Sequence, residues 1–132
     1  MKKELSVLVA ATVLGACVTE PAAPPPPSGA MTFATNCASC HGPLGEGDGP
    51  VATTMAVAVP NLRTLAQRNG GEFPAEAVAS YIDGRSLPAA HGTRLMPVWG
   101  DVFAATQRLV VDAAGSEERI AAVIDFLREL QY

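Results

Sequence analysis

The feature that most constrains this chain is the run Cys37-Ala38-Ser39-Cys40-His41. It contains two of the three cysteines and one of the two histidines in a sequence of 132 residues. On a helix, residues three and four positions apart share a face, so Cys37, Cys40 and His41 would point the same way. The run therefore predicts two thiols and an imidazole on one side of a helix.

Three chemistries use such a run. A C-x-x-C-H spacing is typical of covalent haem attachment, in which both thiols add to the haem vinyl groups and the histidine binds the iron. A thioredoxin-like dithiol needs a βαβ context, and a zinc site needs a second pair of ligands. The only other cysteine and histidine are Cys17 and His91. The sequence thus predicts one covalently bound haem c, with Cys37 and Cys40 as attachment residues and His41 as an iron ligand.

A six-coordinate haem iron also needs a second axial ligand, and a methionine thioether is one of the common choices. Met96 is the predicted ligand, because Pro97 and the glycine that follows can hold its loop in a fixed shape. The other methionines are expected to be removed (Met1), to lie too close to the attachment site (Met31) or to fill the core (Met55). His91 is the alternative ligand.

The N-terminus has the pattern of a secretory signal. Lys2 and Lys3 precede a stretch without charge from Leu5 to Ala16. A helix of that length rises about 18 Å, too short for a hydrocarbon core of about 30 Å. Because the run ends in Leu-Gly-Ala before Cys17 and so resembles a bacterial lipobox, residues 1–16 are predicted to be cleaved and Cys17 to be lipidated. An ordinary cleaved signal with an incidental cysteine is the alternative.

Residues 17–28 combine the anchor cysteine with a proline-rich segment. Such a segment favours extended polyproline II at about 3.1 Å per residue, so we interpret it as a spacer between membrane and domain. Residues 29–132 remain as one folded domain. The formal charge of the chain is −4, and its two lysines lie in the predicted signal, so the mature domain is acidic and lacks lysine. This composition argues against nucleic acid and favours a partner with a basic or an apolar surface.

Residues 29–132 resemble the class I c-type cytochromes. The resemblance rests on Gly29 and Phe33 before the motif, on Pro60-Asn61-Leu62 and on the Met96 loop. It implies a small all-α cytochrome c fold, with three to five helices around one haem and the N- and C-terminal helices crossing at Gly29 and Phe33. It also implies that the Pro60 carbonyl accepts the second ring proton of His41 and that Leu62 touches the haem edge. A glycine-rich insert at residues 42–50 and the missing lysine ring depart from the family.

Helical periodicity agrees with an all-α domain, and no alternation long enough for a strand occurs. Ser116 is the predicted N-cap of a C-terminal helix whose apolar positions run to Leu130, with Phe126 beside them. Further helices are predicted at 74–82, 62–69 and 102–111, the first having a proline in its first turn and Gly84 just past its end. Glu46 and Asp48 are expected in a solvated turn rather than in a calcium loop.

These patterns predict a one-electron carrier in the bacterial cell envelope, lipid-anchored and facing the periplasm. It would pass electrons between a donor and an acceptor protein, without a small-molecule substrate, either alone or as the electron-accepting subunit of an oxidoreductase. A gas-binding or sensing haem domain and a haem-free dithiol protein are the alternatives. Tyr81, Arg85 and Trp99 are expected either to hydrogen-bond a haem propionate or Met96, or to fill the core.

Overall fold

The computed structural model describes residues 28–86, 95–110 and 114–132, and within them the fold is all-helical with no strand. This confirms the predicted fold class. The helices are α1 (Gly29–Asn36), α2 (Ala38–His41), α3 (Leu65–Arg68), α4 (Ala75–Asp83), α5 (Trp99–Leu109) and α6 (Ser116–Glu129). Two short 3-10 turns, η1 (Ala52–Thr54) and η2 (Leu62–Thr64), lie between α2 and α3.

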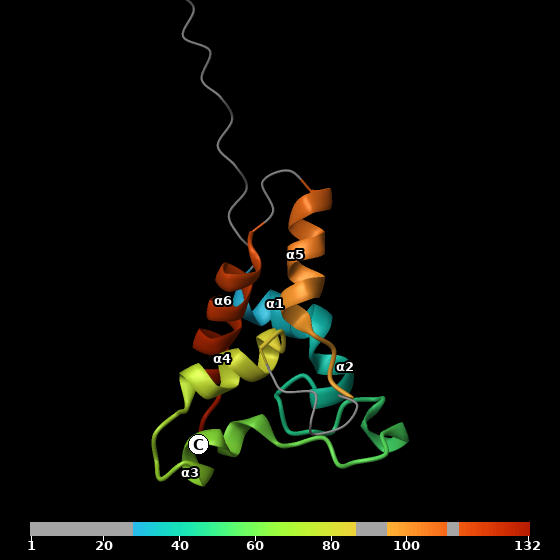
Figure 1. Cartoon of the computed structure of the whole chain (residues 1–132). Helices are drawn as coiled ribbons and strands as arrows, with labels where there is room; N and C mark the ends of the chain where they lie inside the picture. Colours follow the sequence, from blue (N-terminus) through green and yellow to red (C-terminus); the bar gives the residue numbers. More distant parts are fainter. Residues whose placement is uncertain (1–27, 87–94, 111–113) are drawn as a thin grey trace, which may run out of the picture.

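Helix α6 is the centre of the packing. It contacts α1, α4 and α5, and these four longer helices surround the core, while the short helix α2 lies at the right and α3 at the lower left of the view (Figure 1). The buried hydrophobic residues of the core cluster are Phe33, Ile82, Phe103, Ile120, Val123, Ile124 and Leu127. Four of them come from α6, as its predicted apolar face required.

The first and last helices cross as the resemblance implied. Phe33 of α1 packs on Phe126 of α6 with ring centroids 5.3 Å apart, and Phe33 itself is 1% exposed. Gly29 lies directly against the backbone of Ala122, with no room for a side chain. A glycine at this position lets the two helices approach closely enough for the aromatic pair to form.

Helix α4 lies one residue further along the chain than predicted, at Ala75–Asp83 rather than 74–82, and Gly84 follows its end as expected. Pro74 is its N-cap, and Gly84 ends it in the left-handed conformation at φ 71°. For α6, Gly115 is the N-cap and Ser116 is the first helical residue, so the predicted Ser116 cap is wrong by one position. The reason is the carboxylate of Glu118, which accepts a hydrogen bond from the Gly115 N–H at 3.2 Å and closes the first turn without the serine hydroxyl.

The other differences in the helices have local causes. Because the chain bends at Cys37, the N-terminal helical stretch is divided into α1 and α2, and the described helices number more than the three to five expected. Helix α5 begins at Trp99 rather than Val102, since the Val98 carbonyl accepts hydrogen bonds from the N–H groups of residues 101 and 102. The segment 62–69 divides into η2 and α3.

None of the helices in the described ranges has the length and apolar character needed to span a bilayer. The predicted signal, Cys17 and most of the spacer, and also His91, lie outside the described residues.

Candidate functional site

The cysteine and histidine motif begins at the bend between α1 and α2. Cys37 caps the end of α1, and its carbonyl accepts the N–H groups of Cys40 at 3.1 Å and of His41 at 2.9 Å. These bonds keep the motif helical, so the predicted common face is retained. Neither Cys37 nor Cys40 forms a disulfide. Burial, with a smaller contribution from Cys40, raises the pKa of the Cys37 thiol to about 11.

The imidazole of His41 is oriented by the backbone of a distant segment. Its Nδ1 lies 3.3 Å from the carbonyl oxygen of Pro60. Because a carbonyl can only accept, the proton of the neutral ring is on Nδ1 and the lone pair is on Nε2. Burial lowers the pKa of His41, and the hydrogen bond to Pro60 partly opposes that shift. The ring is therefore held neutral, in the tautomer that a metal-binding Nε2 requires.

The glycine-rich insert wraps around the motif. Its backbone N–H groups donate to carbonyls of the motif. Gly47 donates to the His41 carbonyl at 2.8 Å, and Gly49 donates to the Cys40 carbonyl at 3.1 Å. Gly49 lies so close to the Ser39 carbonyl that no Cβ would fit, and Gly47 has φ 84° and lies against the Pro60 peptide. The glycine-rich insert, in which this chain departs from the family pattern, thus joins the motif to the Pro60 segment.

The segment that carries Pro60 is fixed at its next residues. The N–H of Leu62 bonds to the Gly45 carbonyl at 2.7 Å, and the Asn61 side chain accepts from the N–H of Arg63 at 2.8 Å. Leu62 is half-buried and packs against the core cluster, as does Cys37. The structure therefore brings Cys37, Cys40, His41, Pro60 and Leu62 into one region.

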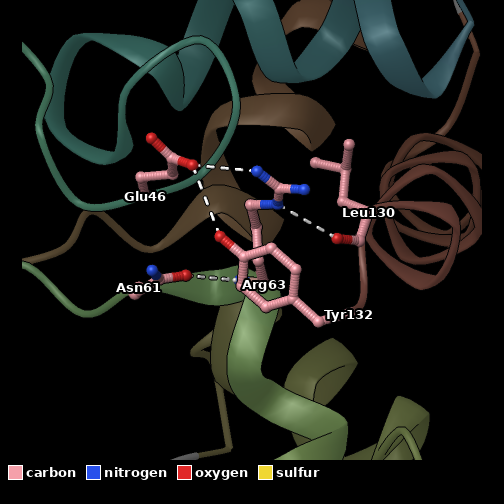
Figure 2. Close-up of polar contacts among 5 residues, drawn as sticks. All are labelled: Glu46, Asn61, Arg63, Leu130 and Tyr132. Atoms are coloured by element: carbon pink, nitrogen blue, oxygen red, sulfur yellow. Dashed lines mark hydrogen bonds and ion pairs between the residues drawn. The ribbon is translucent and has the colours of Figure 1, made fainter.

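Sequence reasoning missed the polar cluster beside this region. Figure 2 shows Arg63 donating to the Glu46 carboxylate at 2.8 Å and to the Leu130 carbonyl at 3.3 Å, with the Tyr132 hydroxyl also reaching Glu46. Glu46 does lie in a turn of the glycine-rich insert, but it is ion-paired rather than simply solvated. No local pattern links residues 46, 63 and 132, so only the folded chain brings them together.

The predicted second ligand lies on another part of the chain. Met96 is half-buried before α5 and packs, like Trp99, against the core cluster. Trp99 stacks on Phe103 with ring centroids 5.6 Å apart, which supports its interpretation as a core residue. Arg85 pairs with Asp83 at 2.6 Å, and its hydrogen bond lowers the pKa of that carboxyl. Tyr81 is 55% exposed.

The donor set of the region suits a haem with covalent links better than a bare metal ion. Across the residues the structure describes, no group of three or more histidine, cysteine, aspartate and glutamate side chains is arranged to hold an ion. The raised pKa of Cys37 also differs from the lowered pKa of thiols in reactive dithiol proteins. Two thiols one helical turn apart, beside a neutral imidazole with a directed Nδ1–H, fit the attachment of a haem.

The comparisons with known proteins agree with this chemistry. The family model described as cytochrome c matches residues 28–131, which include every residue of the region just described. Neither the curated proteins nor the solved structures gave a significant match.

Proposed function

Since the chain belongs to the cytochrome c family, whose members bind haem c covalently and take part in electron transfer, we propose that it is a one-electron carrier with a histidine and methionine ligated haem. Haem c, when bound, supplies an iron that alternates between ferric and ferrous states. In this proposal Cys37 and Cys40 hold the macrocycle, and His41 and Met96 are the axial ligands. Redox proteins are its donor and acceptor partners.

The observation that carries the proposal is the hydrogen bond between His41 Nδ1 and the Pro60 carbonyl. It directs Nε2 away from Pro60 and increases the basicity of the ring, which favours binding to iron. The insert restrains the same histidine through its backbone, because Gly47 donates to the His41 carbonyl. A histidine restrained at its ring Nδ1 and at its backbone carbonyl reorganises little when an electron arrives or leaves, which is what a carrier needs.

Met96 is proposed as the second ligand on its position. It lies in a segment separate from the motif, and both it and Cys37 pack against the same core cluster. Leu62 packs there too and is proposed to contact the edge of the macrocycle. A thioether ligand raises the reduction potential relative to a second imidazole, so a moderately high potential is expected.

We further propose that the carrier is anchored in the bacterial cell envelope and faces the periplasm. The basic start, the uncharged run at 5–16 and the lipobox-like residues before Cys17 support export and lipidation. The proline-rich residues 18–28 would separate the domain from the head groups by roughly 30 Å. A lysine-free acidic domain favours partners with basic surfaces.

The experiment that tests the proposal starts from the chain produced in a bacterium that assembles c-type cytochromes. Intact-mass spectrometry should find one haem joined covalently to the protein, and the reduced form should give a low-spin c-type spectrum that reverses on oxidation. Release of free haem into an acidic organic extract would overturn covalent attachment. Rapid binding of carbon monoxide by the reduced protein at neutral pH would contradict the electron-carrier proposal and favour a gas-binding domain.

A further inference from the structure

We propose that Arg63 is a positioning residue for the haem-binding imidazole: it clamps the Pro60 carbonyl against His41 by joining the glycine-rich insert to the C-terminus. The inference rests on the proposed function, because it assigns Arg63 a role in setting the potential of the same site. Arg63 touches neither the motif cysteines nor His41 in the contacts described above. It acts through the segment that begins three residues before it.

The Pro60 carbonyl and His41 share a common support. Gly47 donates to the His41 carbonyl at 2.8 Å and lies against the Pro60 peptide, while Gly45 accepts from Leu62 at 2.7 Å. Residues 45–47 are thus bonded to the histidine on one side and to the Pro60 segment on the other. This turn therefore helps to set the distance between His41 Nδ1 and the Pro60 oxygen.

Arg63 holds this turn through Glu46, the residue between the two bonded glycines. Its Nη1 donates to Glu46 at 2.8 Å and its Nε donates to the Leu130 carbonyl at 3.3 Å (Figure 2). A guanidinium presents several donors in one fixed plane, so it can satisfy two acceptors from different parts of the chain at once. The side chains of Arg63 and Glu46 are only 25% and 38% exposed.

The C-terminal residues Gln131 and Tyr132 pack against Arg63 and its neighbours. The guanidinium carbon of Arg63 lies 4.1 Å from the centre of the Tyr132 ring, and the Tyr132 N–H donates to the Arg63 carbonyl at 3.3 Å. The side-chain amide of Gln131 donates to the Leu62 carbonyl at 2.9 Å and accepts a hydrogen bond from the Ala66 N–H at 2.9 Å. Because several contacts converge, Arg63 is held more firmly than an isolated surface ion pair would be.

Loss of the Arg63 clamp should raise the reduction potential. A firm Nδ1–H to carbonyl bond makes the imidazole more basic and favours ferric iron. When the clamp is lost, the bond opens more often, the ferric form is less favoured and the potential rises. Removal of the positive charge of Arg63, taken alone, would stabilise ferric iron and lower the potential. Positioning and simple charge therefore predict opposite shifts for R63Q.

The experiment uses haem-loaded protein labelled with ¹⁵N in histidine. In the reduced R63Q variant, we expect the His41 Nδ1–H to exchange with solvent about fivefold faster than in the wild type, the effect of about 1 kcal/mol in an opening equilibrium. The ratio of ferrous to ferric protein at a fixed ambient potential should rise about threefold. At 59 mV for each tenfold change in that ratio, the reduction potential rises by about 28 mV. The double variant E46Q/R63Q should show the same upward shift, although its net charge is unchanged.

Three further proteins complete the design. R128Q removes the same charge from the exposed pair of Arg128 with Asp125 on α6 and should leave the exchange rate and the potential at wild-type values. R63K keeps the charge without the planar donors, so its exchange should stay faster than in the wild type. If R63Q does not fold, E46Q alone should still speed the exchange, because it weakens the same clamp from the other side.

The outcomes separate the two proposals. A wild-type protein with no covalent haem overturns the proposed function, and the role of Arg63 with it. A haem-loaded wild type with unchanged Nδ1–H exchange in R63Q and E46Q overturns the positioning role alone. A lowered potential in R63Q, or exchange in R63K as slow as in the wild type, would show that Arg63 acts only by its charge. Either result would also overturn the positioning role.

Discussion

The α carbon of Gly29 lies against the carbonyl group of Ala122, so closely that a Cβ on residue 29 would overlap that oxygen. The same Cβ would also come 3.0 Å from the Cβ of Phe126. The contact joins the first and last helices at the point where Phe33 and Phe126 pack together. It ties the helix that precedes the motif to the central helix of the fold.

Gly29→Ala should therefore be strongly destabilising. Overpacking against backbone cannot be relieved by a side-chain rotation, so we expect the free energy of unfolding to fall by about 3 kcal/mol. Guanidinium denaturation followed by circular dichroism measures it. Gly115→Ala is the matched control, since a Cβ there would meet only the Gln107 side chain at ordinary distances, and its effect should stay below about 1 kcal/mol. An equal decrease in the free energy of unfolding in the two variants would contradict the close crossing of α1 and α6.

Local signals were enough to predict helices α4 and α6. The apolar spacing of Ile120, Val123, Ile124 and Leu127 places them all inside the core, as α6 shows. Gly84 ends α4 because a left-handed residue is needed there. Such features depend on neighbours within one or two turns of chain, which is the range that a sequence pattern covers.

Long-range polar contacts were not predictable in the same way. Arg63 and Glu46 are each ordinary charged residues in sequence, and their pairing depends on how the insert folds over the motif. The bond between His41 and Pro60 was expected only through family resemblance, and the structure contains it. Residues brought together across such separations share no periodicity, so a single sequence carries no signal for them.

Met96→Ala should remove the proposed sixth ligand while leaving the haem attached. We expect loss of the thioether-to-iron charge-transfer band of the ferric protein, a fall in reduction potential and rapid carbon monoxide binding to the ferrous form. Met55→Ala is the control, because Met55 is also half-buried but follows η1 and is not a predicted ligand. Survival of the band in Met96→Ala would assign the ligand elsewhere, with His91 the next candidate.

Removal of the cofactor should unfold the domain. In the described ranges only eight hydrophobic residues are buried, and one of them is an alanine, so the protein part of the core is small. The double variant Cys37→Ala/Cys40→Ala, made without covalent haem, should lose most of its far-ultraviolet helical signal and its cooperative thermal transition. A cooperative transition in that variant would show that the polypeptide core suffices by itself.

Cys17→Ser should release the protein from the membrane. Two or three acyl chains hold a protein stably on a bilayer, so loss of the anchor cysteine should move it from the membrane pellet to the soluble fraction. The haem spectrum should be unchanged, because residue 17 precedes the folded domain. Mass spectrometry of the mature wild type should find a lipid-modified N-terminal cysteine, and an unmodified one would contradict the anchor.

Stability should decrease between about pH 6.5 and pH 5 because of His41. Burial lowers the pKa of His41 in the folded state, whereas the unfolded chain has the ordinary value of about 6.5. Below that pH the unfolded state takes up a proton that the folded state does not, so the free energy of unfolding falls as the pH falls, by at most about 1.4 kcal/mol per pH unit. With haem bound through His41, as proposed, both ring nitrogens would be engaged and the sign would be the same. Asp83 does not contribute in this window, because its lowered pKa lies below the ordinary 3.8.

Denaturation curves at pH 5.0, 5.5, 6.5 and 7.5, with a haem spectrum at each pH, measure this dependence. His91→Gln removes the other histidine. The decrease should remain in that variant if His41 is its source, and its disappearance there would transfer the effect to His91. A free energy of unfolding that stays constant over the window in the wild type would mean that His41 is protonated as easily in the folded protein as in the unfolded chain, contrary to its burial.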